Sequence, residues 1–271
     1  MGRNKHAVIG KCCICGIESE LTFEHIPPRC AGNKNGVRVH KLEDILGKDA
    51  PIWKRSNIPY KQLQKGYGSH SLCKSCNNDT GTWYGSAYCE VSNLFKNIVM
   101  ENRIKSGRTI DVALSIRPLN FIKQVLSMFC TSNGRPINGF VRELVLDKEL
   151  SAESLRNIKI SMVVNIGSVH HTSGVAGKMQ LNFREGNSGS RVAILSDIMY
   201  FPLGFIMYID PSDGDEIAGL DISKFIQYKF DEEVLIRMRI SVVESNSIFP
   251  GDFRSRNEIE MGYDEVEENE L

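Results

Sequence analysis

The stretch CCICG, residues 12–16, contains one Cys-x-x-Cys pair, and LCKSCN, residues 72–77, contains a second. Two such pairs, each on a tight turn, can supply four thiolates to one tetrahedral zinc ion. Gly16 follows the first pair at a position where this kind of turn, a knuckle, needs a residue free to adopt positive φ. We therefore predict one structural zinc site formed by Cys12, Cys15, Cys73 and Cys76.

The 57 residues between the pairs, 16–72, form a long insert that must leave the zinc site and return to it. Closing both knuckles on one ion brings LTFEHIPPRC, residues 21–30, close to CNNDTG, residues 76–81. Proline resists helix continuation and pushes the preceding residue toward extended geometry. The two prolines after EHI therefore predict that Glu24 and His25 lie at the end of a strand, where a stiff loop begins.

The other cysteines carry no comparable spacing. Cys13 and Cys15 are too close to form the first pair in place of Cys12 and Cys15. An even total of eight cysteines is compatible with disulfides, but a chain that begins with a polar segment and shows no secretion signal is a poor candidate for them. We predict that Cys30, Cys89 and Cys130 are ordinary small core residues.

The composition is that of a soluble globular protein, with 41% hydrophobic and 24% charged residues. Apolar runs fall short of the roughly 18 residues that span a bilayer, so the expected location is the cytoplasm, without membrane partners. Charge is unevenly spread: residues 1–110 hold 17 lysines and arginines against 9 acidic residues, a net +8, and residues 111–271 carry −8. A basic half suits a polyanionic partner, although a solvated surface with chance asymmetry explains it equally well.

The remainder of the chain predicts an α+β protein with a mixed sheet. A helix is expected from about Thr82 to Met100, and NFIKQVLSMFC, residues 120–130, reads as a buried helix. TIDVALSI, residues 109–116, alternates like a strand, and later apolar runs have strand length. We predict a zinc-stabilised domain at 1–105, an α+β accessory domain of unknown role at 106–257, and an acidic, frayed tail at 258–271.

The order CxxCG, TxEHIPPR, LCxxCN resembles the HNH endonucleases of the zinc-containing ββα-metal type, over roughly residues 10–90. The resemblance implies an N-terminal domain of two strands and a helix around the zinc. It further implies that Glu24 and Asn77 bind one catalytic Mg²⁺ or Mn²⁺ and that His25 is the general base. Oxygen ligands suit those ions, and an ordinary histidine titrates near neutrality.

The sequence departs from the family's pattern in three places. Glu24 stands where aspartate is more frequent, and Asn77 where histidine is frequent. Gly68 occupies the position of the polar residue that normally orients the base. We predict that His70, nearby on the returning strand, orients His25 or contacts the scissile phosphate, with Ser69 or a backbone carbonyl as alternatives.

The predicted function is phosphodiester hydrolysis in nucleic acid, DNA more than RNA by family analogy, in a restriction or phage-defence setting. Arg29, Lys34 and Arg38 in the loop after EHIPP are candidate phosphate contacts. One alternative is a zinc-ribbon module that binds nucleic acid or protein without cutting. Another is a structural or regulatory subunit whose acidic half mimics nucleic acid or binds a protein partner. A regulatory partner or a homo-oligomer also fits the nuclease hypothesis.

Overall fold

The structure is a computed structural model that describes residues 7–45, 51–134, 139–184, 187–211 and 217–269. The strands are β1 (Ile9–Lys11), β2 (Glu18–His25), β3 (Val37–Val39), β4 (Lys61–Leu63), β5 (Gly68–Cys73), β6 (Thr109–Ile116), β7 (Ile158–Asn165), β8 (His171–Thr172), β9 (Ala176–Arg184), β10 (Asn187–Met199), β11 (Leu203–Ile209), β12 (Leu220–Asp221) and β13 (Val234–Val243). The helices are α1 (Leu42–Ile45), α2 (Lys74–Trp83), α3 (Gly85–Asn102), α4 (Pro118–Asn133), α5 (Gly139–Leu146) and α6 (Arg256–Asn269), with 3-10 turns η1 (Arg29–Ala31), η2 (Ile52–Lys54) and η3 (Ser223–Gln227).

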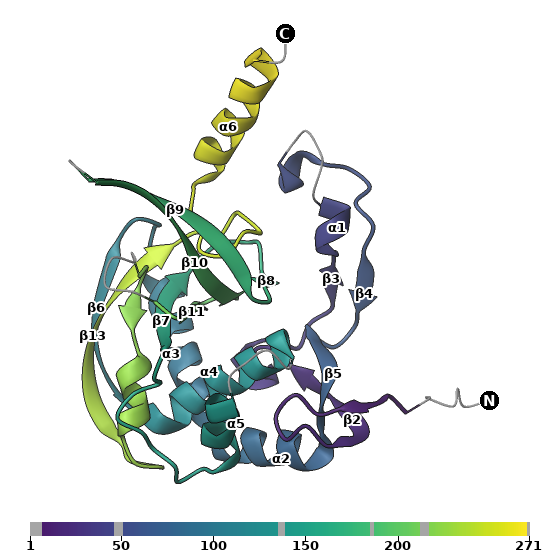
Figure 1. Ribbon diagram of the computed structural model, residues 1–271, viewed down its shortest axis with the longest axis vertical. Helices are drawn as coiled ribbons and strands as arrows, with labels where there is room; N and C mark the ends of the chain where they lie inside the picture. The colour runs from purple at the N-terminus through teal and green to yellow at the C-terminus, as the bar shows by residue number, and fades with distance from the viewer. Residues whose placement is uncertain (1–6, 46–50, 135–138, 185–186, 212–216, 270–271) are drawn as a thin grey trace.

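Two separate sheets carry most of these strands (Figure 1). The smaller sheet has the order β1-β2-β5, and its pairs are antiparallel. The larger follows the path β6-β13-β7-β11-β10-β8, with β12 added to β7 and β9 added to β10. Its pairs are antiparallel except β13 with β7, which is parallel, so the predicted mixed sheet of an α+β protein is confirmed.

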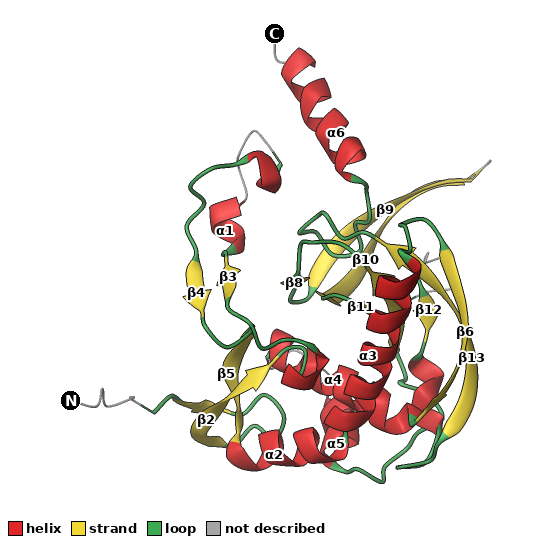
Figure 2. Cartoon of the chain, turned by 180° about the vertical axis from the view of Figure 1, so that it is seen from behind, coloured by secondary structure: helices red, strands yellow, loops and turns green. Residues whose placement is uncertain are grey.

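Helix α4 is the centre of the core, and α3 and α5 pack against it. All residues from Pro118 to Thr131 are buried, including the polar ones, as the run of apolar residues in this segment predicts. Helices α3, α4 and α5 lie between the small sheet and the large one (Figure 2). One continuous hydrophobic cluster extends from Cys12 and Leu72 through Phe121 to Met238. The division into domains at residue 105 stays a prediction.

The helix expected from about Thr82 to Met100 is confirmed as α3, Gly85–Asn102, which starts three residues later than expected because Thr82 and Trp83 end the separate helix α2. Helix α2 begins directly after the second knuckle, where the Cys73 sulfur accepts the Cys76 N–H and caps the first turn. Helix α2 ends before Tyr84, whose φ of −121° is not helical, and α3 then runs from Gly85 to Asn102. The strand at Thr109–Ile116 and the buried helix at residues 120–130 are confirmed.

A two-stranded excursion from the small sheet, which we call the arm (residues 36–45 and 51–64), contains β3, β4, α1 and η2. It projects on the same side as α6 (Figure 1). Trp53 Nε1 donates a 2.8 Å hydrogen bond to Glu260, and Lys54 Nζ lies 3.3 Å from the same carboxylate. The acidic tail, which was predicted to fray, is helical as far as Asn269 and contacts the arm. Residues 1–6 of the predicted first domain and residues 270–271 of the predicted tail lie outside the described residues.

Candidate metal and nucleic-acid site

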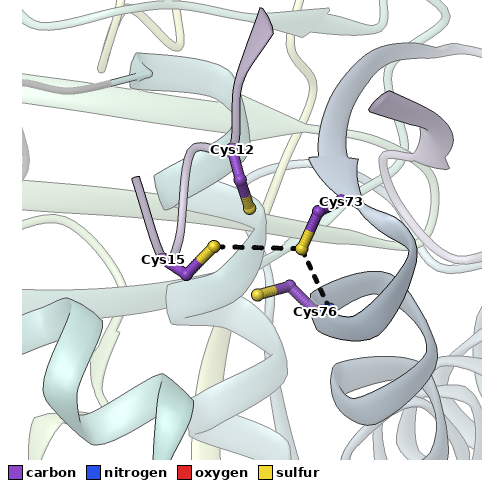
Figure 3. Close-up of side chains that lie close together, drawn as sticks. All are labelled: Cys12, Cys15, Cys73 and Cys76. Atoms are coloured by element: carbon purple, nitrogen blue, oxygen red, sulfur yellow. Dashed lines mark hydrogen bonds between the residues drawn. The ribbon is translucent and has the colours of Figure 1, made fainter. Parts of the chain in front are cut away.

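The four knuckle cysteines come together at the join between the small sheet and α2 (Figure 3). Cys12 and Cys15 follow β1, Cys73 ends β5, and Cys76 lies in the first turn of α2. Their sulfur atoms all lie within 4.8 Å of one another, and Cys15 Sγ is 3.8 Å from Cys73 Sγ. Tetrahedral zinc with Zn–S bonds of about 2.3 Å requires sulfur separations of about 3.8 Å. The cluster therefore has the donor set and nearly the spacing of a Cys₄ metal site.

The backbone of the first knuckle holds these sulfur atoms in place. Gly16 has φ +78°, as predicted, and its N–H donates to the Cys12 carbonyl at 2.9 Å. The Cys13 N–H donates to the Ser71 carbonyl at 2.9 Å, which fixes the knuckle to β5. Cys12 is buried and belongs to the cluster, in agreement with the exclusion of a Cys13–Cys15 pair.

The four thiols affect each other's ionisation. Without a cation, only part of the cluster can carry negative charge. A hydrogen bond from Cys76 lowers the pKa of Cys12 to about 4. The same bond raises the pKa of Cys76 far above its ordinary value. A divalent ion would remove this competition, because it stabilises all four thiolates together.

The segment EHIPP leaves the small sheet one strand away from the cluster. Strand β2 ends at His25, as the following prolines predict, and its register pairs Glu24 with Ser69 and His25 with Gly68. Asn77 lies in the first turn of α2, where Nδ2 donates to Thr22 Oγ1 at 2.8 Å and to the Phe23 carbonyl at 3.3 Å. These two bonds fix the amide against β2 and leave Oδ1 available as a ligand.

Glu24, His25 and Asn77 line one cleft with a volume of about 620 Å³. Its opposite wall comes from the start of α3, with Ser86 and Glu90. The Glu24 carboxylate forms no hydrogen bond or ion pair with the residues that the structure describes. Burial without a cation raises its pKa to about 7. An unpaired carboxylate of this kind in a cleft is typical of a functional site.

His25 is held by the main chain. Its Nε2 lies 2.9 Å from the Lys65 carbonyl, so the ring donates from Nε2 and keeps Nδ1 as the acceptor. Burial lowers the pKa of His25, the Lys65 carbonyl raises it, and the nearby Arg29 guanidinium lowers it, with a net decrease. The imidazole is therefore neutral near pH 7, which is the form that accepts a proton.

The absence of a side chain at Gly68 has a steric cause. A Cβ built on Gly68 would lie 2.0 Å from the Glu24 carbonyl oxygen. The β2–β5 register, with its irregularity between Thr22 and Phe23, brings the two backbones this close. The orienting acceptor therefore comes from the loop before β5, at Lys65, which is the backbone alternative considered from the sequence.

The other predicted contact residues lie at different places. His70 is exposed, and its ring contacts Phe23 edge-on at 5.4 Å, whereas Phe23 contacts His25 at 4.9 Å. A role for His70 at the phosphate stays a prediction. Arg29 lines the cleft, Lys34 is exposed on the loop after η1, and Arg38 belongs to the arm, where its guanidinium lies over the Tyr60 ring.

Cys30 and Cys89 correct one prediction. They are not independent core residues but form a disulfide that links η1 to α3, and both line the cleft beside Glu24. Cys130 is fully buried in α4, as predicted. The disulfide carries no spacing signal, because its partners are 59 residues apart and meet only when α3 folds against the EHIPP loop. The sequence likewise carries no signal for the Lys65 carbonyl as an acceptor, because every residue type has a backbone carbonyl.

Comparison of the chain with protein-family models, with curated proteins and with solved structures finds no match. Within the part of the chain that the structure describes, no helix is both long enough and apolar enough to cross a membrane.

Proposed function

We propose that this protein is a zinc-stabilised, metal-dependent endonuclease of the HNH type that hydrolyses phosphodiester bonds in nucleic acid. The observation that carries the proposal is the cleft shared by Glu24, His25 and Asn77 beside the four-cysteine cluster. The cleft offers a neutral histidine, together with a carboxylate and an amide oxygen that have no hydrogen-bond partner among the residues that the structure describes. These are the groups that metal-assisted hydrolysis of a phosphodiester requires.

Each group has a role in this proposal. Glu24 and Asn77 Oδ1 hold Mg²⁺ or Mn²⁺, hard cations that prefer oxygen ligands. The ion, when bound, supplies positive charge for the phosphate and the leaving oxygen. His25 accepts the proton of the attacking water at Nδ1, because Nε2 is occupied by the Lys65 carbonyl. Arg29 at the cleft gives a fixed positive charge for a neighbouring phosphate.

The cysteine cluster has a structural role. Four thiolates suit zinc, and a closed set of four protein ligands keeps no position for substrate. A bound ion would join the knuckle after β1 to β5 and α2; β5 pairs with β2, which carries Glu24, and α2 carries Asn77. The proposed substrate is DNA in preference to RNA, by analogy with the resembled family. The proposed setting is a defence or restriction effector, restrained by a regulatory partner or by its own second half.

The test is cleavage of supercoiled plasmid and of a labelled RNA, with Mg²⁺, with Mn²⁺ and without added metal. We expect metal-dependent cleavage by the full chain, and a loss of about 10²-fold or more in His25→Ala and in Glu24→Gln. Glu20→Gln is the matched control, since Glu20 is exposed on the same strand and lies outside the cleft. Activity that survives in His25→Ala, or is lost equally in Glu20→Gln, contradicts the assignment.

A second candidate function is a zinc module that binds nucleic acid without cutting it. It is favoured by the two bonds that hold the Asn77 amide against β2, because they give this residue a structural purpose without any metal. The two functions separate in one experiment. Retention of DNA in a mobility-shift assay, with no cleavage under any metal condition, identifies the binding module.

A further inference from the structure

A second cavity, with a volume of about 430 Å³, lies between the arm and the edge of the large sheet. The arm contributes Val39 and His40, and the sheet side contributes His170, Thr172 and Tyr200. The volume lies within the roughly 300–1,000 Å³ typical of small-molecule sites. The cavity is separate from the Glu24 cleft, and the proposed nuclease function does not use it.

The lining of this cavity favours an anionic ligand. Among the lining residues that the structure describes, Arg38 is the only fully charged side chain and none is a carboxylate. The nearby carboxylate of Asp197 is buried and already occupied by His171, by Ser173 and by the Gly251 N–H. Arg38 lines the cavity on the arm side, and its guanidinium also lies 4.8 Å from the centre of the Tyr60 ring, which stands outside the lining.

The opposite side of the cavity favours a flat ring. The rings of His170 and Tyr200 lie against each other with centroids 4.3 Å apart and are tilted by 32°. Beside them, Ile198 and Met199 add apolar surface, and Thr172 adds a hydroxyl. Aromatic and apolar faces with a few polar groups bind planar heterocycles by stacking and by edge hydrogen bonds.

We propose that this cavity binds a nucleotide, with the base against His170 and Tyr200 and the phosphate toward Arg38. A flat heterocycle joined to an anion combines both requirements, whereas a fatty acid leaves the aromatic pair without a stacking partner. A free phosphate leaves the apolar side empty.

The walls of the cavity connect to the candidate base through the main chain. Ile26, which lines the cavity, follows His25 directly, and its N–H donates to the Tyr67 carbonyl at 3.1 Å. Tyr67 is two residues beyond Lys65, whose carbonyl holds His25, and its hydroxyl meets Thr172 Oγ1 at 2.7 Å. A ligand that reorders these walls therefore also acts on the position of His25, an effect that rests on the proposed function.

The buried Asn33 side chain strengthens this connection. It is fully inaccessible, donates to the carbonyls of Pro27 and Tyr67 at 2.7 Å each, and accepts the Tyr67 N–H at 2.7 Å. The loop after His25 and the start of β5 are thus one hydrogen-bonded unit that forms a wall of the cavity.

The test is isothermal titration of the full chain with AMP, GMP, adenosine and inorganic phosphate, in buffer without divalent cations. We expect a nucleoside monophosphate to bind about tenfold or more tightly than adenosine or phosphate alone, because it uses both sides of the cavity. Arg38→Ala should reduce AMP affinity to that of adenosine. Tyr200→Ala should weaken AMP and adenosine alike, and Arg237→Ala, an exposed arginine on β13, should change neither.

The Arg38→Ala and Tyr200→Ala variants distinguish this cavity from the Glu24 cleft, because neither residue lines that cleft. The proposal is overturned if no nucleotide binds at about millimolar concentration, the weak limit of specific affinity. It is also overturned if Arg38→Ala weakens DNA binding and leaves AMP binding unchanged. Because the measurement is binding and not cleavage, a failed nuclease assay does not affect its outcome.

Discussion

At the residue scale, Gly68 shows that the lack of a side chain can be a requirement. A Cβ there would meet the Glu24 carbonyl at 2.0 Å, a contact that only backbone movement can relieve. We expect Gly68→Ala to lower the free energy of unfolding by about 1–3 kcal/mol or more, because it forces β2 and β5 apart. Chemical denaturation measures the change.

Gly81→Ala is the matched control for this prediction. A Cβ on Gly81, inside α2, would meet nothing within 4 Å, and alanine in a helix is better than glycine by roughly 0.5–1 kcal/mol. The control should therefore be neutral or stabilising. Equal destabilisation by both substitutions would mean that the close approach of β2 and β5 is not present.

Lys123 gives a pH dependence with a definite sign. Its side chain is fully enclosed in α4, where Nζ donates to the carbonyls of Asp147 and Lys148, and burial lowers its pKa from 10.5 to about 8. Between pH 8 and pH 10.5 the unfolded chain holds a proton that the folded chain has released. Stability from this group therefore rises with pH across that window, by up to about 3 kcal/mol.

Replacing Lys123 by methionine should remove this rise. The comparison is the difference in unfolding free energy between wild type and Lys123→Met, measured from pH 7 to pH 10.5, because other titrating groups cancel in it. Lys96→Met, on an exposed position of α3, should give a difference that does not change with pH. A wild-type advantage that stays constant from pH 8 upward would show that Lys123 keeps its ordinary pKa.

At the element scale, the knuckles determine where the small sheet meets α2. Loss of Cys73 removes one of the four candidate metal ligands and also the cap on the first turn of α2. We expect Cys73→Ser to lose the bound zinc and to unfold the β1-β2-β5 region, because metal binding contributes directly to folding. Elemental analysis should find one zinc per wild-type chain and per Cys13→Ser chain. Zinc retained by Cys73→Ser would contradict the site.

The disulfide between Cys30 and Cys89 closes a second link, from η1 to α3. The cysteines are 59 residues apart, and for a loop of this length the chain-entropy treatment gives a stabilisation of the folded state of about 4 kcal/mol. Measured stabilisation by disulfides is typically about 2–4 kcal/mol. We expect Cys30→Ser to lower stability by that amount. A thiol titration of the unfolded protein provides the check: six free thiols support the bond, and eight contradict it.

The sequence predicts those elements whose side chains repeat with a clear period. The alternation in Thr109–Ile116 and the apolar run in α4 gave the correct element types. The arm strands, Val37–Val39 and Lys61–Leu63, are too short to show a period. The exact start of α3 was not predicted, and the break falls at Tyr84, directly before Gly85.

The candidate site was predictable only where side chains carry the chemistry. Cysteine spacing predicted the cluster, and the prolines predicted the strand end at His25. The acceptor at Lys65 is a backbone atom, and the wall at Glu90 belongs to a helix more than 60 residues away in sequence. Contacts of this kind follow from tertiary packing, which no local pattern specifies.

At the scale of the whole molecule, charge separates the two halves of the chain, with +8 in residues 1–110 and −8 in the rest. We expect DNA binding by the full chain to weaken log-linearly with salt, because phosphate contacts release counterions. Arg29→Ala should reduce the slope by about 1, and Arg237→Ala in the acidic half should leave it unchanged. Fluorescence anisotropy at several salt concentrations measures both. If Arg29→Ala leaves the slope unchanged, or if affinity does not depend on salt, the basic half is not the binding surface.

Strand β13 sets an order of events during synthesis. It is the last strand of the large sheet to leave the ribosome, yet it lies between β6 and β7, pairing with both. Until it emerges, the nascent sheet is two pieces with open edges, while both knuckles have long been outside the exit tunnel. The four-cysteine cluster can thus form early, and the large sheet closes only after Val243 has emerged. A chain that stopped short of Val234 would carry the four-cysteine cluster attached to an incomplete sheet with open, aggregation-prone edges.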